Sequence, residues 1–434
     1  MAGLMIAAPA SGTGKTTVTL ALIAALRASG RRVRSAKAGP DYIDPAFHAA
    51  ASGEPCINLD AFAMRPELLE ALGAEQARGA DAFIVEAMMG LFDGAADGTG
   101  SAADLAARLG LNIALVVDCA RQSHSVAALV SGFHSFRADT RVAGLILNRV
   151  GSPRHGAMLR NALEPLGIPI LAILPRRDEL ALPERHLGLV QAGEHRDLSA
   201  FLETAARWMT ENAELDGLAA LGAPGSGQES PGVRMLRPLG QRIAIARDAA
   251  FAFAYPHMLK GWAEQGAELS FFSPLADEAP TREADAIFLP GGYPELHGGS
   301  LAAAGKFKAG MRTAAERGVL IYGECGGYMV LGEELVDAAG EAHAMTGLLP
   351  LVTSFAERRL HLGYRRLRPL AGAPFEGELM GHEFHYSVTL REAAEDTGVS
   401  SLFAARDALG TDLGVTGLRR GSVMGSFCHV IDRR

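Results

Sequence analysis

The chain has 434 residues, of which 48% are hydrophobic and 21% are charged, and its formal net charge is -8. This length exceeds what one ordinary hydrophobic core organises and predicts at least two domains, while the composition is far from that of a disordered chain. Because the chain has no basic run, its charge argues against a nucleic-acid partner and against binding to an anionic membrane.

The amino terminus and the cysteines bear on the compartment. The short apolar run Leu4–Ala8 lacks the basic flank and the longer core of a signal peptide, so it reads as a buried strand. The four cysteines, Cys56, Cys119, Cys325 and Cys428, form no CxxC pair and have no metal-ligand spacing. This pattern indicates neither a disulfide framework nor a zinc site. We therefore expect a cytoplasmic protein.

The first half of the chain has the pattern of a doubly wound α/β domain, which we place at residues 1–215. Short runs rich in Val, Ile and Leu alternate with longer Ala-rich stretches, as in a mostly parallel sheet wrapped by helices. The predicted strands are Leu4–Ala8, Ala82–Glu86, Ile113–Asp118, Gly144–Asn148 and Ile170–Leu174.

A glycine-rich loop, PASGTGKTT at residues 9–17, follows the first strand and precedes a helix predicted at Val18–Ala28. It matches the phosphate-loop pattern G-x-x-x-x-G-K-[ST] except that Pro9 replaces the first glycine. In such a loop backbone N–H groups surround phosphate oxygens, Lys15 meets the β- and γ-phosphates, and the Thr16 hydroxyl ligates Mg²⁺. A chance glycine-rich turn is the weaker alternative. The residues expected to bind ATP here are Gly12, Thr13, Gly14, Lys15, Thr16 and Thr17.

Two acidic segments, GPDYIDP at residues 39–45 and EAMMGLFDG at residues 86–94, each follow a predicted strand. They would bring Asp41, Asp44, Glu86 and Asp93 to the carboxyl edge of the sheet, where doubly wound folds bind ligands. A Mg²⁺ ion carried by phosphates needs one or two protein carboxylates, and Asp41 and Glu86 suit that role beside Thr16. Each acid taken alone reads more often as a helix cap or a solvated loop residue.

A change of composition marks the end of this half. Residues 216–240 include GAPGSGQESPG, which collects Gly, Pro and Ser without periodicity and predicts an exposed linker. A second α/β domain is expected at residues 241–434. Its predicted strands are Arg242–Ala246, Glu268–Phe272, Ala286–Leu289 and Val319–Tyr322.

The second half carries a candidate nucleophile. The segment LIYGECGGYM at residues 320–329 runs from an apolar strand into glycine-flanked Cys325, the pattern of a nucleophile elbow, where a helix amino end favours the thiolate. A small buried structural cysteine is the alternative. The expected base is His429 in the carboxyl-terminal segment GSFCHVID. The amides of Gly292, in LPGGYPE, and Gly326 are candidates for an oxyanion hole.

Taken together, GPDYIDP, EAMMGLFDG, GECGGYM and the terminal histidine segment resemble the cobyrinic or hydrogenobyrinic acid a,c-diamide synthases over essentially the whole chain. That family joins an ATP-binding half similar to dethiobiotin synthetase with a half similar to class I glutamine amidotransferases. The resemblance implies that ATP converts a corrinoid carboxylate to an acyl phosphate. It also implies that Cys325, activated by His429, releases ammonia from glutamine, and that ammonia displaces the phosphate, first on one acetate side chain and then on the other.

The resemblance further implies roles for single residues. It places Asp41, Asp44, Glu86 and Asp93 in phosphorylation and Mg²⁺ chemistry, Lys37, Tyr42 and Ile43 in substrate recognition, and Asn148 in reading adenine, with a strand-end cap as the alternative for Asn148.

One position departs from the usual glutaminase triad. The acid expected two residues after the histidine is Ile431, and Asp432 would face the other way in a strand. The resemblance implies a Cys/His pair, so the group that orients His429 stays open. The histidines of GHEFHYS, residues 381–387, either face the corrinoid or support the domain, and we favour support.

Hydrogenobyrinate or cobyrinate, glutamine and ATP are thus the expected partners, with Mg²⁺ as cofactor. We favour the cobalt-free ring over the cobalt form. The alternatives are nickel-sirohydrochlorin a,c-diamide synthase; cobyric acid synthase, against which GPDYIDP argues; and a partitioning-type regulatory ATPase, in which Cys325 and His429 would have no role. The oligomeric state stays open, with a homodimer as one candidate.

Overall fold

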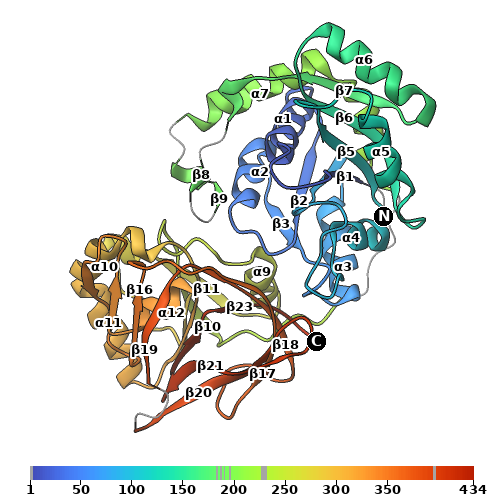
Figure 1. Ribbon diagram of the computed structural model, residues 1–434. Helices are drawn as coiled ribbons and strands as arrows, with labels where there is room; N and C mark the ends of the chain where they lie inside the picture. The colour runs from blue at the N-terminus through green and yellow to red at the C-terminus, as the bar shows by residue number, and fades with distance from the viewer. Residues whose placement is uncertain are drawn as a thin grey trace. The chain divides into compact units, whose positions relative to one another are not determined.

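The computed structural model describes residues 3–181, 184–185, 188–189, 191–194, 197–225, 232–393 and 397–434. The chain divides into two compact units, Met1–Val233 and Arg234–Arg434 (Figure 1). Helix α8 (Leu215–Gly222) occupies the first residues of the expected linker because it contacts β1 and β4 and buries Leu218. Residues 226–231 of the predicted linker lie outside the described part of the chain.

A seven-stranded parallel sheet organises the first unit, in the order β3-β2-β4-β1-β5-β6-β7. The strands predicted for this half are all present, with small shifts at their ends, and β1 and β4 are wholly buried. The doubly wound fold is therefore confirmed. The strands of the sheet are β1 (Leu4–Ala7), β2 (Val33–Ala38), β3 (Cys56–Leu59), β4 (Ala82–Glu86), β5 (Asn112–Asp118), β6 (Arg141–Val150) and β7 (Ile170–Pro175), and a separate hairpin pairs β8 (Glu184–Arg185) with β9 (Gly188–Leu189).

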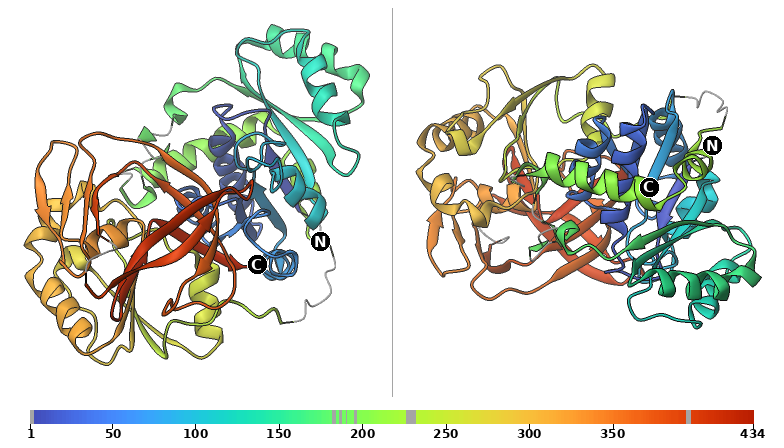
Figure 2. Two further views of the ribbon diagram at one scale, coloured as in Figure 1. Left: turned by 60° about the horizontal axis from the view of Figure 1, so that its bottom comes forward. Right: turned by 90° about the horizontal axis from the view of Figure 1, so that it is seen from above.

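Helices cover both faces of this sheet (Figures 1 and 2). Helix α1 contacts α2, α7 and α8, while α3 contacts α4 and α5 contacts α6. This grouping follows from right-handed crossovers that run in opposite directions on the two sides of β1. The helices are α1 (Lys15–Ala28), α2 (Asp44–Ser52), α3 (Pro66–Ala77), α4 (Ala102–Leu109), α5 (Val126–Ser135), α6 (Pro153–Leu163), α7 (Leu198–Asn212) and α8, with the 3-10 turns η1 (Glu164–Leu166), η2 (Asp178–Leu180) and η3 (Ala192–Glu194).

The second unit begins as the predicted α/β domain. Strands β11, β10, β12, β13 and β22 are parallel neighbours in a ten-stranded sheet, and all four strands predicted for this half are present. The elements up to the thiol site are β10 (Arg242–Ala246), α9 (Pro256–Glu264), β11 (Glu268–Phe272), η4 (Pro274–Ala276), β12 (Ala286–Leu289), η5 (Pro294–Leu296), α10 (Gly298–Ala303), α11 (Gly305–Glu316), β13 (Leu320–Glu324) and α12 (Gly326–Leu331).

After α12, the described part of the chain contains strands and no further helix. Strands β14, β15, β16 and β19 form a four-stranded sheet, and the others extend the ten-stranded sheet with antiparallel neighbours. Their bounds are β14 (Glu334–Val336), β15 (Ala342–Ala344), β16 (Leu351–Ser354), β17 (His361–Pro369), β18 (Leu379–His385), β19 (Val388–Glu392), β20 (Val399–Arg406), β21 (Asp412–Arg420), β22 (Val423–Ser426) and β23 (Cys428–Arg433).

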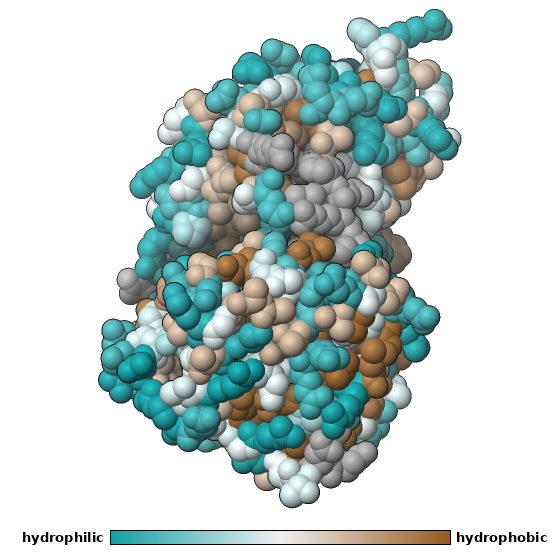
Figure 3. Space-filling model, turned by 90° about the vertical axis from the view of Figure 1, so that its left-hand side faces the viewer, coloured by the Kyte–Doolittle hydropathy of each residue, from teal (hydrophilic) through white to brown (hydrophobic). Residues whose placement is uncertain are grey.

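Figure 3 shows hydrophilic side chains over much of one face, with apolar side chains in smaller groups. Most of the large apolar side chains exposed among the described residues belong to the second unit, for example Leu362, Leu390 and Val415. Across the described ranges, we find no helix with both the length and the apolar character needed to span a membrane.

Candidate active sites

The phosphate loop lies at the carboxyl end of β1, the strand at which the sheet order changes direction. Gly14 has a φ of 87°, and a Cβ atom there would lie 2.6 Å from Asn148 Nδ2, so both conformation and space require glycine. Lys15 is buried and its ammonium donates a hydrogen bond to the Met89 carbonyl at 2.5 Å. Burial lowers the pKa of Lys15. The loop thus holds its lysine beside the second acidic segment.

A buried network of charges lies beside this loop. The Lys37 ammonium donates hydrogen bonds to Asp44 Oδ2 at 2.5 Å and to Glu86 Oε1 at 2.9 Å, and the Thr16 hydroxyl donates to Glu86 Oε1 at 2.7 Å. The other oxygen of Glu86, Oε2, lies 2.6 Å from His48 Nε2. The structure therefore brings together four residues predicted for the site, which are Thr16, Lys37, Asp44 and Glu86, and adds His48.

Two opposing effects set the protonation states in this network. Burial disfavours the charged form of each group, and pairing with an opposite charge favours it. Burial disfavours the Glu86 carboxylate, but Lys37 and His48 outweigh it and lower the pKa of Glu86. Burial and the neighbouring Asp41 raise the pKa of Asp44 to about 7. Burial opposes the imidazolium of His48, yet its contacts with Cys56 and Glu86 raise its pKa to about 10. Glu86 is therefore held ionised while Asp44 titrates near neutral pH.

The remaining residues of the acidic segments have more local roles in the structure. Asp41 Oδ1 accepts hydrogen bonds from the amides of Ile43 and Asp44, which caps the start of α2, and Asp41 Oδ2 lies 3.9 Å from Lys37 Nζ. Asp93 Oδ2 accepts from the Gly90 amide and closes a turn. Ile43 is buried and Tyr42 is half-buried. Substrate recognition by Lys37, Tyr42 and Ile43 stays a prediction.

A cavity of about 970 Å³ opens over the phosphate loop. This volume lies at the upper end of the range for small-molecule sites. Asn148 lines it and donates its amide hydrogen to the Thr13 carbonyl at 2.8 Å, so contact with adenine stays a prediction. Arg149, with a φ of 57°, donates to Gly12 O and pairs with Asp118 at 2.5 Å. No sequence motif indicated a role for Arg149.

The thiol of the second unit lies on a sharp turn between β13 and α12. Cys325 has a φ of 47° and a ψ of -107°, and its amide donates to the Ser426 carbonyl at 2.8 Å. A Cβ atom at Gly327 would overlap the Leu289 carbonyl oxygen, so the helix can follow the cysteine this closely only with glycine there. This is the strained strand-to-helix turn that the glycine-flanked sequence predicts.

Cys325 and His429 meet at Gly291. A Cβ atom on Gly291 would lie 3.1 Å from His429 Nε2 and 3.3 Å from Cys325 Cβ. Burial and the nearby Glu295 raise the pKa of the Cys325 thiol, whereas a hydrogen bond from the Gly326 amide lowers it. Burial lowers the pKa of His429 to about 3. The pair is therefore a thiol and a neutral imidazole on the same side of Gly291, and the Cys325 sulfur lies 3.8 Å from the Phe384 carbonyl oxygen.

The two amides proposed for the oxyanion hole lie in the same place. A Cβ atom on Gly326 would lie 3.0 Å from the Gly292 nitrogen. The Gly326 amide already interacts with the Cys325 sulfur. The two backbone segments are therefore close together beside Cys325, and the role of these amides as an oxyanion hole stays a prediction.

The acidic neighbour of His429 is one that the sequence pattern did not indicate. Glu324 Oε2 lies 3.7 Å from His429 Nδ1, and both side chains are buried. Asp432 instead acts on His257, whose imidazole contacts the Ile431 carbonyl at 2.8 Å. Glu324 directly precedes the nucleophile, whereas the usual glutaminase pattern places the acid after the histidine, so the sequence pattern gave no signal for it.

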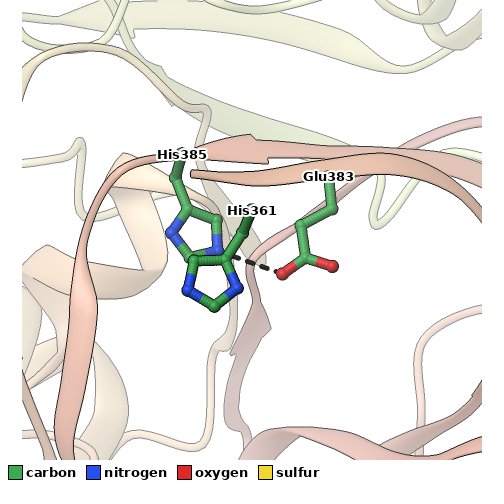
Figure 4. Close-up of side chains that lie close together, drawn as sticks. All are labelled: His361, Glu383 and His385. Carbon is green, nitrogen blue, oxygen red and sulfur yellow. Dashed lines mark hydrogen bonds and ion pairs between the residues drawn. The ribbon is translucent and has the colours of Figure 1, made fainter. Parts of the chain in front are cut away.

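The histidines of GHEFHYS lie on β18. His385 Nε2 contacts Glu383 Oε1 at 3.0 Å, Arg365 pairs with Glu383 Oε2 at 2.7 Å, and the rings of His361 and His385 stack with centroids 4.6 Å apart and planes 7° from parallel (Figure 4). Imidazole lone pairs lie in the ring plane, so stacked parallel rings do not point at one shared ion. The arrangement favours a role in bracing β17 and β18 over a metal site.

Comparison with known proteins agrees with this geometry. Residues 4–190 match the family model of the CobQ/CobB/MinD/ParA nucleotide binding domain, and residues 242–434 match that of the CobB/CobQ-like glutamine amidotransferase domain. A hydrogenobyrinate a,c-diamide synthase of Brucella anthropi is 62% identical over 100% of this chain and 99% of its own length. Those of Brucella abortus and Rhizobium meliloti are 61% and 59% identical, again over 100% of this chain and 99% of their own length.

Fold and site together define a glutamine amidotransferase with a nucleotide-binding unit. The chain belongs to the family of hydrogenobyrinate a,c-diamide synthases. The partitioning-type ATPase is thereby set aside, since that class offers no role for the amidotransferase unit.

Proposed function

We propose that this protein converts the a and c acetate carboxylates of hydrogenobyrinate to amides, with glutamine as nitrogen donor and ATP as the activating substrate. The observation that carries the proposal is the meeting of Cys325 and His429 at Gly291, in a chain whose other unit holds a phosphate loop. The ring follows from the names of the relatives, which specify hydrogenobyrinate. The four free cysteines support a cytoplasmic location.

In the amidotransferase unit, the proposed reaction starts with transfer of the Cys325 thiol proton to His429 Nε2. The thiolate attacks the amide carbon of glutamine, and the Gly292 and Gly326 amides stabilise the oxyanion. His429 returns the proton to the departing nitrogen, which leaves as ammonia. Water then hydrolyses the thioester to glutamate and restores the thiol.

In the nucleotide-binding unit, a substrate carboxylate attacks the γ-phosphorus of ATP and releases ADP, giving an acyl phosphate. Ammonia attacks the acyl carbon, phosphate leaves, and the amide remains after loss of a proton. Lys15 is placed to stabilise the charge on the transferring phosphoryl group, and the loop amides to hold the phosphates. A second round on the other acetate completes the product.

The oxygens beside the loop fit the magnesium ion that such a reaction requires. Thr16 Oγ1 and Glu86 Oε1 are 2.7 Å apart, and Asp41 lines the same cavity. Hydroxyl and carboxylate oxygens are the ligands that Mg²⁺ prefers. Thr16, Asp41 and Glu86 would hold the ion, which supplies neutralisation of phosphate charge.

The test is the ATP-dependent change in mass of hydrogenobyrinic acid and of its cobalt form, with glutamine or ammonium as nitrogen source. The wild type should amidate two carboxylates with either source. Cys325→Ala should do so with ammonium only. Amidation of the cobalt form alone would shift the substrate to cobyrinate, and no mass gain on either ring would overturn the assignment.

A further inference from the structure

The amidotransferase site leaves the partner of its base unexplained, because the position two residues after His429 is Ile431. In a Cys/His pair the imidazole must carry its proton on the nitrogen turned away from the thiol, so that the other nitrogen can accept. Here Nε2 is the nitrogen near Cys325, so Nδ1 must be the protonated one. A buried N–H at this atom calls for an acceptor.

Glu324 lies on that side of the ring. It is the last residue of β13, is 1% exposed, and directs Oε2 to a position 3.7 Å from His429 Nδ1. Its other oxygen, Oε1, accepts hydrogen bonds from the Val430 amide at 3.0 Å and from the Tyr322 hydroxyl at 3.2 Å. These two bonds fix the carboxyl group from β13 and from β23 and leave Oε2 facing the imidazole.

Of the other nearby acids, Glu383 raises the pKa of His429 through its charge, but hydrogen bonds hold both of its oxygens elsewhere. Glu383 binds Arg365 and His385, and Asp432 acts on His257. Glu324 also belongs to the same turn as the nucleophile, since Cys325 follows it directly. One short segment therefore supplies both the thiol and a carboxyl group for the opposite side of the histidine ring.

We infer that Glu324 is a positioning residue that sets the tautomer of His429 and stabilises its imidazolium, in place of the acid missing at residue 431. The inference rests on the proposed glutaminase function. Hydrogen bonds of catalytic groups commonly shorten when substrate binds, and we expect the 3.7 Å between Glu324 Oε2 and His429 Nδ1 to shorten in the same way. When Nε2 accepts the thiol proton, the His429 ring becomes a positively charged imidazolium. The Glu324 carboxylate then stabilises that charge through the Nδ1 hydrogen.

The pH dependence of glutamine hydrolysis should reflect the ionisation of Glu324. The titratable groups around Glu324 are Tyr322 on β13, Cys325 beside it, and Cys428 and His429 on β23. Burial raises the pKa of Glu324 to about 8, against the hydrogen bonds from Val430 and Tyr322. The ionised carboxylate accepts the Nδ1 hydrogen more strongly than the neutral acid does, and it alone balances the charge of the imidazolium, so glutamine hydrolysis should increase as pH rises through this value.

The experiment compares glutamine hydrolysis by full-length wild type, Glu324→Gln and Tyr322→Phe from pH 6 to 9. Glutamine keeps an acceptor for the Val430 amide while it removes the charge, so kcat should fall about 100-fold with little change in KM, and the rise near pH 8 should disappear. Tyr322→Phe removes one bond to Oε1 but not the carboxylate, and should cost about threefold or less. A Glu324→Gln variant with near-normal kcat, or with the same fractional loss at every pH, would overturn the inference.

A second measurement needs no change at Glu324. In wild-type protein labelled with ¹⁵N-histidine and measured at pH 9, where Glu324 is ionised, the resonances of His429, identified by their absence in His429→Asn, should show Nδ1 protonated and Nε2 bare. The opposite tautomer would refute the role of Glu324 even if the glutamine variant failed to fold. Absence of any glutamine hydrolysis by wild type would instead refute the proposed function itself.

Discussion

Glu86 is a fully buried carboxylate in the first unit. Its two oxygens contact Thr16, Lys37 and His48. Because His48 holds Oε2, the other oxygen is left for the hydroxyl and the ammonium group. A buried carboxylate is tolerated only when it is paired in this way. We therefore assign His48 the role of fixing the orientation of Glu86.

His48→Gln tests this at the level of stability. The folded-state pKa of His48, about 10, exceeds its ordinary value of 6.5, so its contribution to the free energy of unfolding is complete below pH 6.5 and is lost as pH rises through 10. Breaking the pair should lower the free energy of unfolding by about 3 kcal/mol at pH 6. The difference in this free energy between variant and wild type should shrink toward pH 10. Urea unfolding measures it, with the exposed His134→Gln as control. A difference independent of pH would refute the ion pair.

Sequence motifs predicted the residues whose chemistry depends on a local pattern, such as Lys15 in its loop and Cys325 in its turn. They did not predict His48, Arg149 or Glu324. Each of these acts on a residue far away in the chain or through an unusual backbone angle: His48 reaches Glu86 from another element, and Arg149 has a φ of 57°. Without a recurring spacing, such a contact becomes visible only when the fold is known.

Among the elements, the turn from β13 to α12 sets the geometry of the thiol. Its residues are packed so closely against β12 that Gly327 faces the Leu289 carbonyl directly. Cys325 keeps a positive φ in this turn, a conformation that costs free energy and persists only when the surroundings enforce it. The packing against β12 is what enforces it here.

Gly327→Ala should therefore destabilise the second unit by about 2 kcal/mol or more and reduce glutamine hydrolysis, because the added Cβ meets backbone that cannot move aside. The matched control is Gly299→Ala in α10, where the same methyl group enters open space. That variant should be neutral or gain about 0.5 kcal/mol. Thermal unfolding of both proteins measures the contrast. Equal effects of the two changes would contradict the packing argument.

Most of the strands that the sequence predicts are continuous apolar runs that the fold buries, and β11, which is largely exposed, is an exception. Strand β2 was expected before GPDYIDP but without bounds, because Arg34, Ser35 and Lys37 interrupt its apolar run, and β3 was not predicted because Asn58 interrupts it. The second α/β domain is confirmed, but its described carboxyl-terminal part adds ten strands, β14–β23, which the sequence pattern did not indicate. Strands such as β17, His361–Pro369, are half exposed and rich in arginine, so neither an apolar run nor strict alternation reveals them.

At the scale of the whole molecule, the two sites belong to separate units and use separate chemistry. The phosphate loop and its carboxylates lie within residues 1–233, whereas Cys325, His429 and Glu324 lie within residues 234–434. Changes in one site should therefore remove one half-reaction and leave the other half-reaction measurable.

Lys15→Met is expected to lose amidation with glutamine and with ammonium alike, by about 100-fold or more, because a preorganised charge on the phosphoryl group is removed. Cys325→Ala should lose only the reaction with glutamine. Amide formation is followed by mass spectrometry with each nitrogen source. Full ammonium-dependent activity in Lys15→Met would show that the loop does not serve the synthetic reaction.

The central claim, that nitrogen released at Cys325 ends in the product of the other unit, is tested most directly with amide-¹⁵N glutamine and an excess of unlabelled ammonium at neutral pH. We predict that the wild type places ¹⁵N in both new amides of hydrogenobyrinate a,c-diamide, while Cys325→Ala gives unlabelled product. Unlabelled amides from the wild type under these conditions would contradict the account.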